Sequence, residues 1–331
     1  MGAARRLKTS LRLLRVPFEW LGIWLGVAVF AFLPRRAMLA VSDLISAVMY
    51  AFDARGRRFA LANLRIVSGR LPPERPYRRQ TMPFDPTKAE ERIIRRSYRN
   101  MARAVGHAFW TCRSAKSRVE ESGEMSPKCA RFLAENRPAV TVSGHIGCWE
   151  ILSQLAFLCG HRMMSVAKDI GTSGMTGLLM KARTSIGQEI VHADGAFRPL
   201  MEGLKAGKSL GLLVDQVVKP QKGGVWVRFF GRPHPVSAAP AFFAAKGRAP
   251  IVVAWSRPLR DGRYRCEIVD EIPVGEARDI WATTQRCIAG LERVIRRHPS
   301  CWVLNYNCFR KVPSAEELAE LEARERKAKE A

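Results

Sequence analysis

The stretch AVTVSGHIGCWEILSQLAFLCG, residues 139–160, decides how the chain is expected to fold. It opens with a short apolar and β-branched run, which predicts a buried strand. The segment WEILSQLAFL that follows has the length and apolar content of a buried helix. Strand, glycine-containing turn and helix in succession are the unit of α/β folds. His145 therefore lies at the carboxyl end of a strand, where open α/β sheets hold their active sites.

His145 and Glu150 are the chemically informative pair in this stretch. On one continuous helix, residues five apart point roughly 140° away from each other. With His145 in the turn and Glu150 in the first helical turn, the side chains converge, and Gly144 and Gly147 permit the tight backbone that this needs. The pattern predicts a proton-transfer pair. The alternative is that Glu150 only stabilises the positive end of its helix.

Short apolar runs alternate with helical stretches through the rest of the chain. Predicted strands lie at 138–143, 163–167, 189–192, 209–214, 225–229, 250–255, 264–269 and 301–305, and predicted helices at 149–160, 174–186, 197–206, 237–247 and 279–298. This order predicts an α/β fold with a mixed, mostly parallel sheet flanked by helices. Asp215 and Gln216 follow the strand at 209–214 and would reach the same edge as His145.

Four segments are expected along the chain. Residues 1–36 combine a basic N-terminus with an apolar run at 20–33, which predicts an uncleaved membrane-anchoring helix. A cleaved signal peptide would need a small-residue cleavage site, which does not follow; a buried core helix is the third interpretation. Residues 37–112 predict amphipathic helices with a proline-rich insertion at 72–89, residues 113–312 an α/β core, and residues 313–331 a charged tail.

The charge and the cysteines narrow the class of protein. The 331 residues include 55 Lys plus Arg against 30 Asp plus Glu, a net charge of +25 that attracts nucleic acid, anionic lipid or an acidic protein. No nucleic-acid-binding motif is present, and that class leaves the apolar N-terminus unexplained. Eight cysteines without a CxxC pair indicate reduced, buried thiols. His107, His145, His161 and His192 lack metal-ligand spacing, so metal-dependent hydrolysis is disfavoured.

An ordered series of motifs resembles a known family. His145 to Glu150 is similar to the H-x4-[DE] motif of glycerolipid-type acyltransferases. The blocks LANLRIV (61–67), SGHIGCWEI (143–151), KARTSIGQEIV (181–191), GLLVDQ (211–216) and HPSCWVLNYNCFR (298–310) together resemble the late acyltransferases of lipid A biosynthesis, which add lauroyl or myristoyl chains. The last block departs from the family pattern, with Ser300 and Cys301 where Gln is usual and Asn305 or Asn307 where His is usual.

The resemblance implies an O-acyltransferase that moves a fatty acyl chain from a thioester to a hydroxyl of a membrane glycolipid, a lipid A precursor. It implies an acidic acyl carrier protein as donor, with coenzyme A left open, no cofactor or metal, and a catalytic domain on the cytoplasmic face of the bacterial inner membrane. His145 would be the general base and Glu150 its partner. Arg183 and the backbone N–H of Gly147 are expected oxyanion donors, and Asp215 and Gln216 orient the pair or bind the acceptor. Lysophospholipid acyltransferases are the near alternative, although these usually have Asp at the position of Glu150.

Overall fold

A seven-stranded sheet forms the centre of the molecule. The computed structural model describes residues 29–71, 83–111, 113–167, 180, 184, 186–277 and 279–330. The strands are β1 (Gly123–Met125), β2 (Val140–Ser143), β3 (Met163–Ala167), β4 (Glu189–His192), β5 (Ser209–Leu213), β8 (Ile251–Pro258) and β9 (Tyr264–Ile272). Their order is β1-β9-β8-β2-β5-β3-β4, and every pair is parallel except β8 with β9. The predicted mixed, mostly parallel sheet flanked by helices is confirmed.

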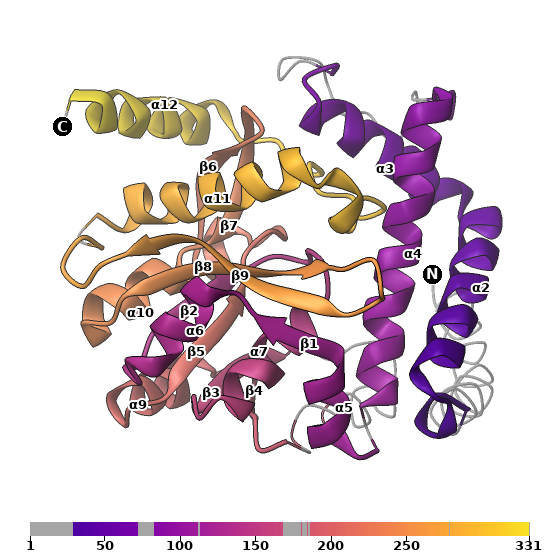
Figure 1. Cartoon of the computed structure of the whole chain (residues 1–331). Helices are drawn as coiled ribbons and strands as arrows, with labels where there is room; N and C mark the ends of the chain where they lie inside the picture. The colour runs from indigo at the N-terminus through magenta and orange to yellow at the C-terminus, as the bar shows by residue number, and fades with distance from the viewer. Residues whose placement is uncertain are drawn as a thin grey trace, which may run out of the picture.

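Helices cover both faces of this sheet (Figure 1). One face packs against α9 (Phe197–Lys205), α10 (Ala239–Gly247) and α11 (Ile280–Arg297), and the other against α5 (Ala115–Ser122), α6 (Pro127–Ala134) and α7 (Trp149–Leu158). Alternate residues at β2 divide between the two faces: Val140 and Val142 join the α10–α11 core, whereas Ala139, directly before the strand, joins the α7 side. The α9–α11 face is filled by apolar side chains, whereas the α7 face contains a cavity.

Three helices from the N-terminal third lie together beside the sheet in Figure 1: α2 (Arg35–Phe52), α3 (Ala54–Val67) and α4 (Lys88–Trp110). The amphipathic segment expected after residue 36 is broken at Asp53, whose carboxylate caps α3, and the two helices meet at 94°. Ser42 of α2 approaches Gly106 of α4 so closely that a Cβ there would lie 2.4 Å from the Ser42 Oγ. Small residues thus bring α2 onto α4.

The predicted anchor at 1–36 falls mostly outside the described residues. Within the described part of the chain, no individual helix has the length and apolar character needed to cross a bilayer, and only the bent pair α2–α3 passes on those two criteria.

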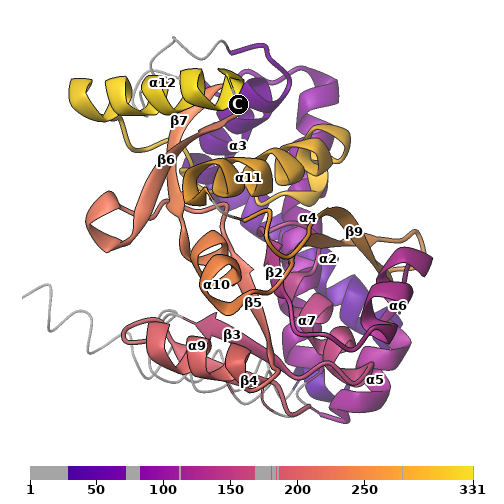
Figure 2. The same ribbon diagram turned by 90° about the vertical axis from the view of Figure 1, so that its left-hand side faces the viewer.

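A separate two-stranded hairpin, β6 (Gly224–Phe229) with β7 (Arg232–Ser237), stands out from the main sheet toward α12 (Ala315–Glu330), as Figure 2 shows. The charged tail forms this last helix, with Leu321 buried and Glu325 paired with Arg228 at 3.0 Å. The tail is therefore anchored on β6 through one apolar and one ionic contact.

Several sequence predictions need correction. No strand forms at 301–305; the segment instead contains the end of a 3-10 turn (Pro299–Cys301) and a single bridge from Trp302 to Ile146. The strand β7 was not predicted because it contains Pro233 and Pro235, and prolines are tolerated only at strand edges. The short β1, α5 and α6 were also not predicted. The helix expected at 174–186 lies largely outside the described residues.

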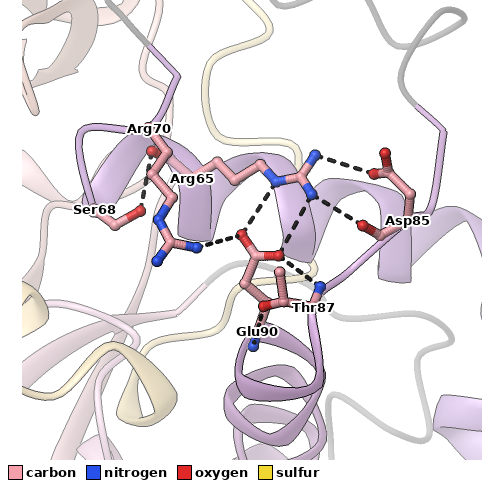
Figure 3. Close-up of polar contacts among 6 residues, drawn as sticks. All are labelled: Arg65, Ser68, Arg70, Asp85, Thr87 and Glu90. Carbon is pink, nitrogen blue, oxygen red and sulfur yellow. Dashed lines mark hydrogen bonds and ion pairs between the residues drawn. The ribbon is translucent and has the colours of Figure 1, made fainter.

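Glu90 joins α3 to the start of α4 through an ion-pair cluster around its buried carboxylate (Figure 3). Its side chain is 5% exposed and accepts from Arg65 at 3.2 Å, from Arg70 at 3.2 Å and from the backbone N–H of Thr87 at 2.9 Å. Burial by itself raises the pKa of Glu90. The hydrogen bonds from Arg65 and Thr87 outweigh it and lower the pKa from 4.5 to about 2.

We predict that Glu90→Gln lowers the free energy of unfolding by about 3 kcal/mol at pH 7. A depressed pKa stabilises above the unfolded value of 4.5, and this stabilisation is lost as pH falls toward 2. The cost of the substitution should therefore shrink to about 1 kcal/mol at pH 3. Urea unfolding at both pH values measures it, with the exposed Glu120→Gln on α5 as control. A cost independent of pH would show that the carboxylate charge does not matter here.

Candidate active site

The buried carboxylate of Asp215, directly after β5, organises the site. Its Oδ1 lies 2.8 Å from the His145 Nδ1, and its Oδ2 accepts from the backbone N–H of His145 at 2.9 Å and from the Trp302 Nε1 at 3.0 Å. Burial raises the pKa of Asp215, but the His145 ring and these donors outweigh burial and hold the pKa below its usual value. Asp215 is thus an ionised acceptor at neutral pH.

The contacts of His145 define its tautomer. A carboxylate only accepts hydrogen bonds, so Nδ1 carries the proton and donates it to Asp215. The other ring nitrogen, Nε2, lies 3.3 Å from the Gln216 Nε2 and accepts from that amide. The His145 side chain is 23% exposed, in contrast to 3% for Asp215. The ring therefore offers a basic nitrogen at the accessible side and an anionic anchor at the buried side.

Two glycines make the turn between β2 and α7 possible. Gly147 has a φ of +65°, and a Cβ there would lie 1.8 Å from the Ser256 carbonyl oxygen. At Gly144, a Cβ would come within 3.0 Å of the Asp215 carboxyl carbon. Any side chain at either position would displace the strand end or the carboxylate.

The backbone N–H groups of this turn are already used within the protein. The N–H of Gly147 donates to the Cys301 carbonyl at 2.8 Å, that of Ile146 to Gly144, and that of Cys148 to the Ser256 hydroxyl. Gly147 was predicted as an oxyanion donor. In this structure its N–H is engaged, and the glycine serves the conformation of the turn. Arg183, the other predicted donor, lies outside the described residues.

Glu150 lies in the first turn of α7 and is 9% exposed. Its Oε1 accepts from the Trp149 indole N–H at 3.2 Å, and the Trp149 ring meets the His145 ring edge-on, with centroids 4.9 Å apart. The sequence predicted that Glu150 receives the ring N–H of His145. The structure gives Asp215, 70 residues along the chain, as the partner of Nδ1.

Residues that the sequence analysis left without a role hold this arrangement in place. The Asn63 amide donates to the carbonyls of Leu304 and Tyr306, both at 2.7 Å, and the Ser97 hydroxyl donates to the Trp302 carbonyl at 2.6 Å. These bonds fix the loop that presents the Trp302 indole to Asp215. Asn63 and Trp302 both occur in the motif blocks quoted above, which is the signal that could have found them.

A second buried histidine supports the backbone of Asp215. The His234 Nε2 lies 3.2 Å from the Asp215 carbonyl oxygen, and burial lowers the pKa of His234 to about 4. The ring is therefore neutral and donates to that carbonyl. In the part of the chain that the structure describes, no three His, Cys, Asp or Glu side chains gather as metal ligands would.

A cavity lined by Glu150 and Trp149 follows the α7 face of the sheet. It encloses about 920 Å³, counted with its opening to solvent. Trp149 and Glu150 line it at α7, and apolar side chains such as Leu133, Phe132 and Ile268 line it further in. Ser143 and Thr141 of β2 line the cavity, as does Ala139 directly before the strand, so the cavity extends from the carboxyl end of β2 to its amino end.

Comparison with known protein families places nearly the whole chain in one match. The model of the family described as bacterial lipid A biosynthesis acyltransferase matches residues 5–311 of the 331. The match spans β1 to β9, the His145 turn and the Trp302 loop. A search of curated proteins gave no match.

We predict that neutral His145 carries its proton on Nδ1, which ¹⁵N NMR of the imidazole nitrogens measures directly. The chain has six histidines, so a His145→Gln spectrum identifies the signal. Asp215→Asn should shift the population toward the Nε2–H form, because an amide no longer favours the Nδ1 proton electrostatically. An Nε2–H tautomer in the unsubstituted protein would contradict the site geometry.

Proposed function

Because the chain belongs to the bacterial lipid A biosynthesis acyltransferase family, we propose that it transfers a fatty acyl chain from a thioester to a hydroxyl of a lipid A precursor. The observation that carries this proposal is the His145–Asp215 pair, whose imidazole ring packs edge-on against Trp149, a residue that also lines an apolar cavity. A basic nitrogen next to a slot for a hydrocarbon chain suits acyl transfer to an alcohol. His145 is the proposed general base.

The proposed reaction needs no nucleophilic side chain. The acceptor hydroxyl attacks the thioester carbonyl while its proton passes to the His145 Nε2. The new C–O bond forms, the C–S bond then breaks, and the imidazolium returns the proton to the departing thiolate. Asp215 stabilises the imidazolium and keeps the ring in the required tautomer, the role of the aspartate in a Ser-His-Asp triad.

Three further residues receive proposed roles. Glu150 adds a second carboxylate beside the site and holds Trp149 against the His145 ring. The Gln216 amide lies next to the reacting nitrogen, so it is a proposed donor to the acceptor hydroxyl or to the oxyanion. Arg183, by family resemblance, supplies a positive charge to the same oxyanion.

The cavity is the proposed slot for the acyl chain. From Ser143 to Ala139 it follows four residues of extended chain, roughly 13 Å at 3.3 Å per residue. Its deeper walls come from α6, β8 and β9, which contribute Phe132, Val252 and Ile268. A medium-length fatty acyl chain has the shape and polarity for such a space.

The charge of the chain agrees with the proposed partners. An acyl carrier protein is strongly acidic, and the acceptor is a phosphorylated glycolipid, so both are attracted to a protein of net charge +25. Exposed arginines follow one face of α4: Arg92, Arg96 and Arg99. The same helix contacts the Trp302 loop through Ser97. A carrier protein bound there would lie near the site, whereas coenzyme A would need no such surface.

The apolar face of α2 is the proposed contact with the bilayer. The buried side chains of α2 are Met38, Ser42, Ser46 and Tyr50, whereas Leu44, Val48 and Phe52 are 67%, 50% and 85% exposed. A helix that docks only on its own protein would not expose three large apolar side chains. A helix lying flat on the cytoplasmic face of the inner membrane would bury these side chains.

We predict that His145→Ala lowers the rate of transfer by at least about 10³-fold, because the variant lacks the general base. Asp215→Asn should lower the rate by about 10³-fold to 10⁴-fold, because the carboxylate that orients the imidazole and stabilises the imidazolium is lost. Glu150→Gln should cost about 10²-fold. The assay follows acylation of a lipid A precursor by mass spectrometry, with acyl carrier protein or coenzyme A thioesters as donors. The exposed His192→Ala is the matched control.

The pattern across these variants tests the assignment. Near-normal transfer in His145→Ala would exclude the proposed base. If Glu150→Gln lowered the rate of acyl transfer more than Asp215→Asn, Glu150 and not Asp215 would be the residue that orients the His145 ring. Acylation of lysophospholipid instead of the lipid A precursor would correct the acceptor while keeping the chemistry.

We predict that the double variant Leu44→Glu, Phe52→Glu binds vesicles of anionic lipid at least about tenfold more weakly. Two apolar side chains that would be buried in the bilayer are replaced by negative charges. Vesicle flotation of the full chain measures this. Val312→Glu changes a side chain that is 85% exposed but lies outside α2, and it should leave binding unchanged. Equal binding by all three proteins would exclude α2 as the membrane contact.

A further inference from the structure

A polar band crosses the proposed acyl slot, whose other walls are largely apolar. Ser165 of β3 and Thr141 of β2 both pair in register with Gly211 of β5, so the three positions form one row across the sheet. All three line the cavity. Because Gly211 has no side chain, the row stays open there; a Cβ would lie 2.9 Å from the Ser165 hydroxyl.

Gln188 completes this band from the start of β4. Its amide nitrogen donates to the Ser165 hydroxyl at 2.9 Å and to the Ser153 hydroxyl of α7 at 3.1 Å. The amide therefore bridges the sheet and the helix that form two walls of the cavity. Gln188 is 3% exposed and is itself part of the lining.

The amide of Gln188 has one polar atom without a partner among the described residues. Its Oε1 is buried and makes no hydrogen bond. Turning the amide over would exchange the two ends and leave the nitrogen in that position instead. A buried amide left half-satisfied costs free energy, so natural proteins retain one where a ligand or a water supplies the missing bond.

The band crosses the slot midway along β2, and through Ser153 it comes within one turn of Glu150 on α7. Thr141 is two residues below Ser143 on β2, roughly 7 Å along the strand, and Ala139 is a further two residues down. Ser153 is one turn of α7 beyond Glu150. A group bound by Gln188 would therefore belong to the part of an acyl chain closer to its carbonyl carbon.

We propose that the acyl donor of this enzyme carries a hydroxyl group near its thioester end, and that Gln188, with Ser165 and Thr141 beside it, binds that hydroxyl. This inference rests on the proposed function, since it names the class of chain that the slot accepts. A hydroxyl both donates and accepts, so it satisfies the free end of the amide in either orientation. Gln188 is a specificity residue here and takes no part in the chemistry.

The test compares dodecanoyl and 3-hydroxydodecanoyl donors, presented as thioesters of acyl carrier protein to the full chain. We expect kcat/KM for the hydroxylated donor to exceed that for the plain donor by about tenfold. Gln188→Leu should abolish this preference and raise turnover of the plain donor. Gln154→Leu replaces another buried glutamine, on α7 outside the cavity lining, and should leave the preference intact.

A binding measurement separates this inference from the proposed function. Dodecanoic acid and 3-hydroxydodecanoic acid are titrated against the full chain and its Gln188→Leu variant by calorimetry. A preference for the hydroxylated acid that disappears in Gln188→Leu supports the inference even where no transfer is found, and absent transfer then counts against the proposed function alone. Equal binding and equal turnover of both chains would overturn the inference and leave Gln188 as the site of an ordered water only.

Discussion

The carboxylate of Asp215 is the constraint on which the rest of the site depends. A buried carboxylate is costly unless donors surround it, and here the donors are the His145 ring, the His145 backbone and the Trp302 indole. The carboxylate and its donors come from three segments far apart in the sequence. Satisfying one charge therefore brings the end of β5, the turn after β2 and the loop after α11 to a single point. That point is where an imidazole acquires a fixed tautomer and an accessible basic nitrogen.

The sequence predicted the frame of this site because the frame depends on local patterns. Short apolar runs identified β2, β3, β5 and β8 closely, and the carboxyl ends of parallel strands necessarily share an edge. His145 and Asp215 were accordingly expected at the same rim. Their hydrogen bond could not be derived, since Glu150 is only five residues from His145 and Asp215 is 70 residues away. Proximity in sequence suggested Glu150 as the partner of the His145 ring, whereas the carboxylate paired with Nδ1 is that of Asp215. The roles of Glu150, Arg183 and Gln216 stay predictions.

The Trp302 loop shows why some structure is not encoded in such patterns. CWVLN has the composition of a strand, but its neighbours are the His145 turn and α4. Its backbone groups therefore form separate hydrogen bonds with these neighbours and no regular ladder with another strand. Asn63 and Ser97 hold its carbonyls, and the cysteine carbonyl before Trp302 takes the N–H of Gly147. β-propensity is outweighed by these tertiary hydrogen bonds. In the resulting loop the Trp302 indole points toward Asp215 and donates a hydrogen bond to its carboxylate.

Successive side chains of a strand point to opposite faces of the sheet, and here one face is closely packed whereas the other contains the cavity. On β2, Val140 and Val142 are fully buried against the α10–α11 core, while Thr141 and Ser143 between them line the cavity under α7. The sequence predicts a buried strand here but does not tell which of its two faces is filled. In the structure a helix covers the side of Thr141 and Ser143 without filling it. Polar groups inside a covered space need hydrogen-bond partners, and the proposal for Gln188 depends on this requirement.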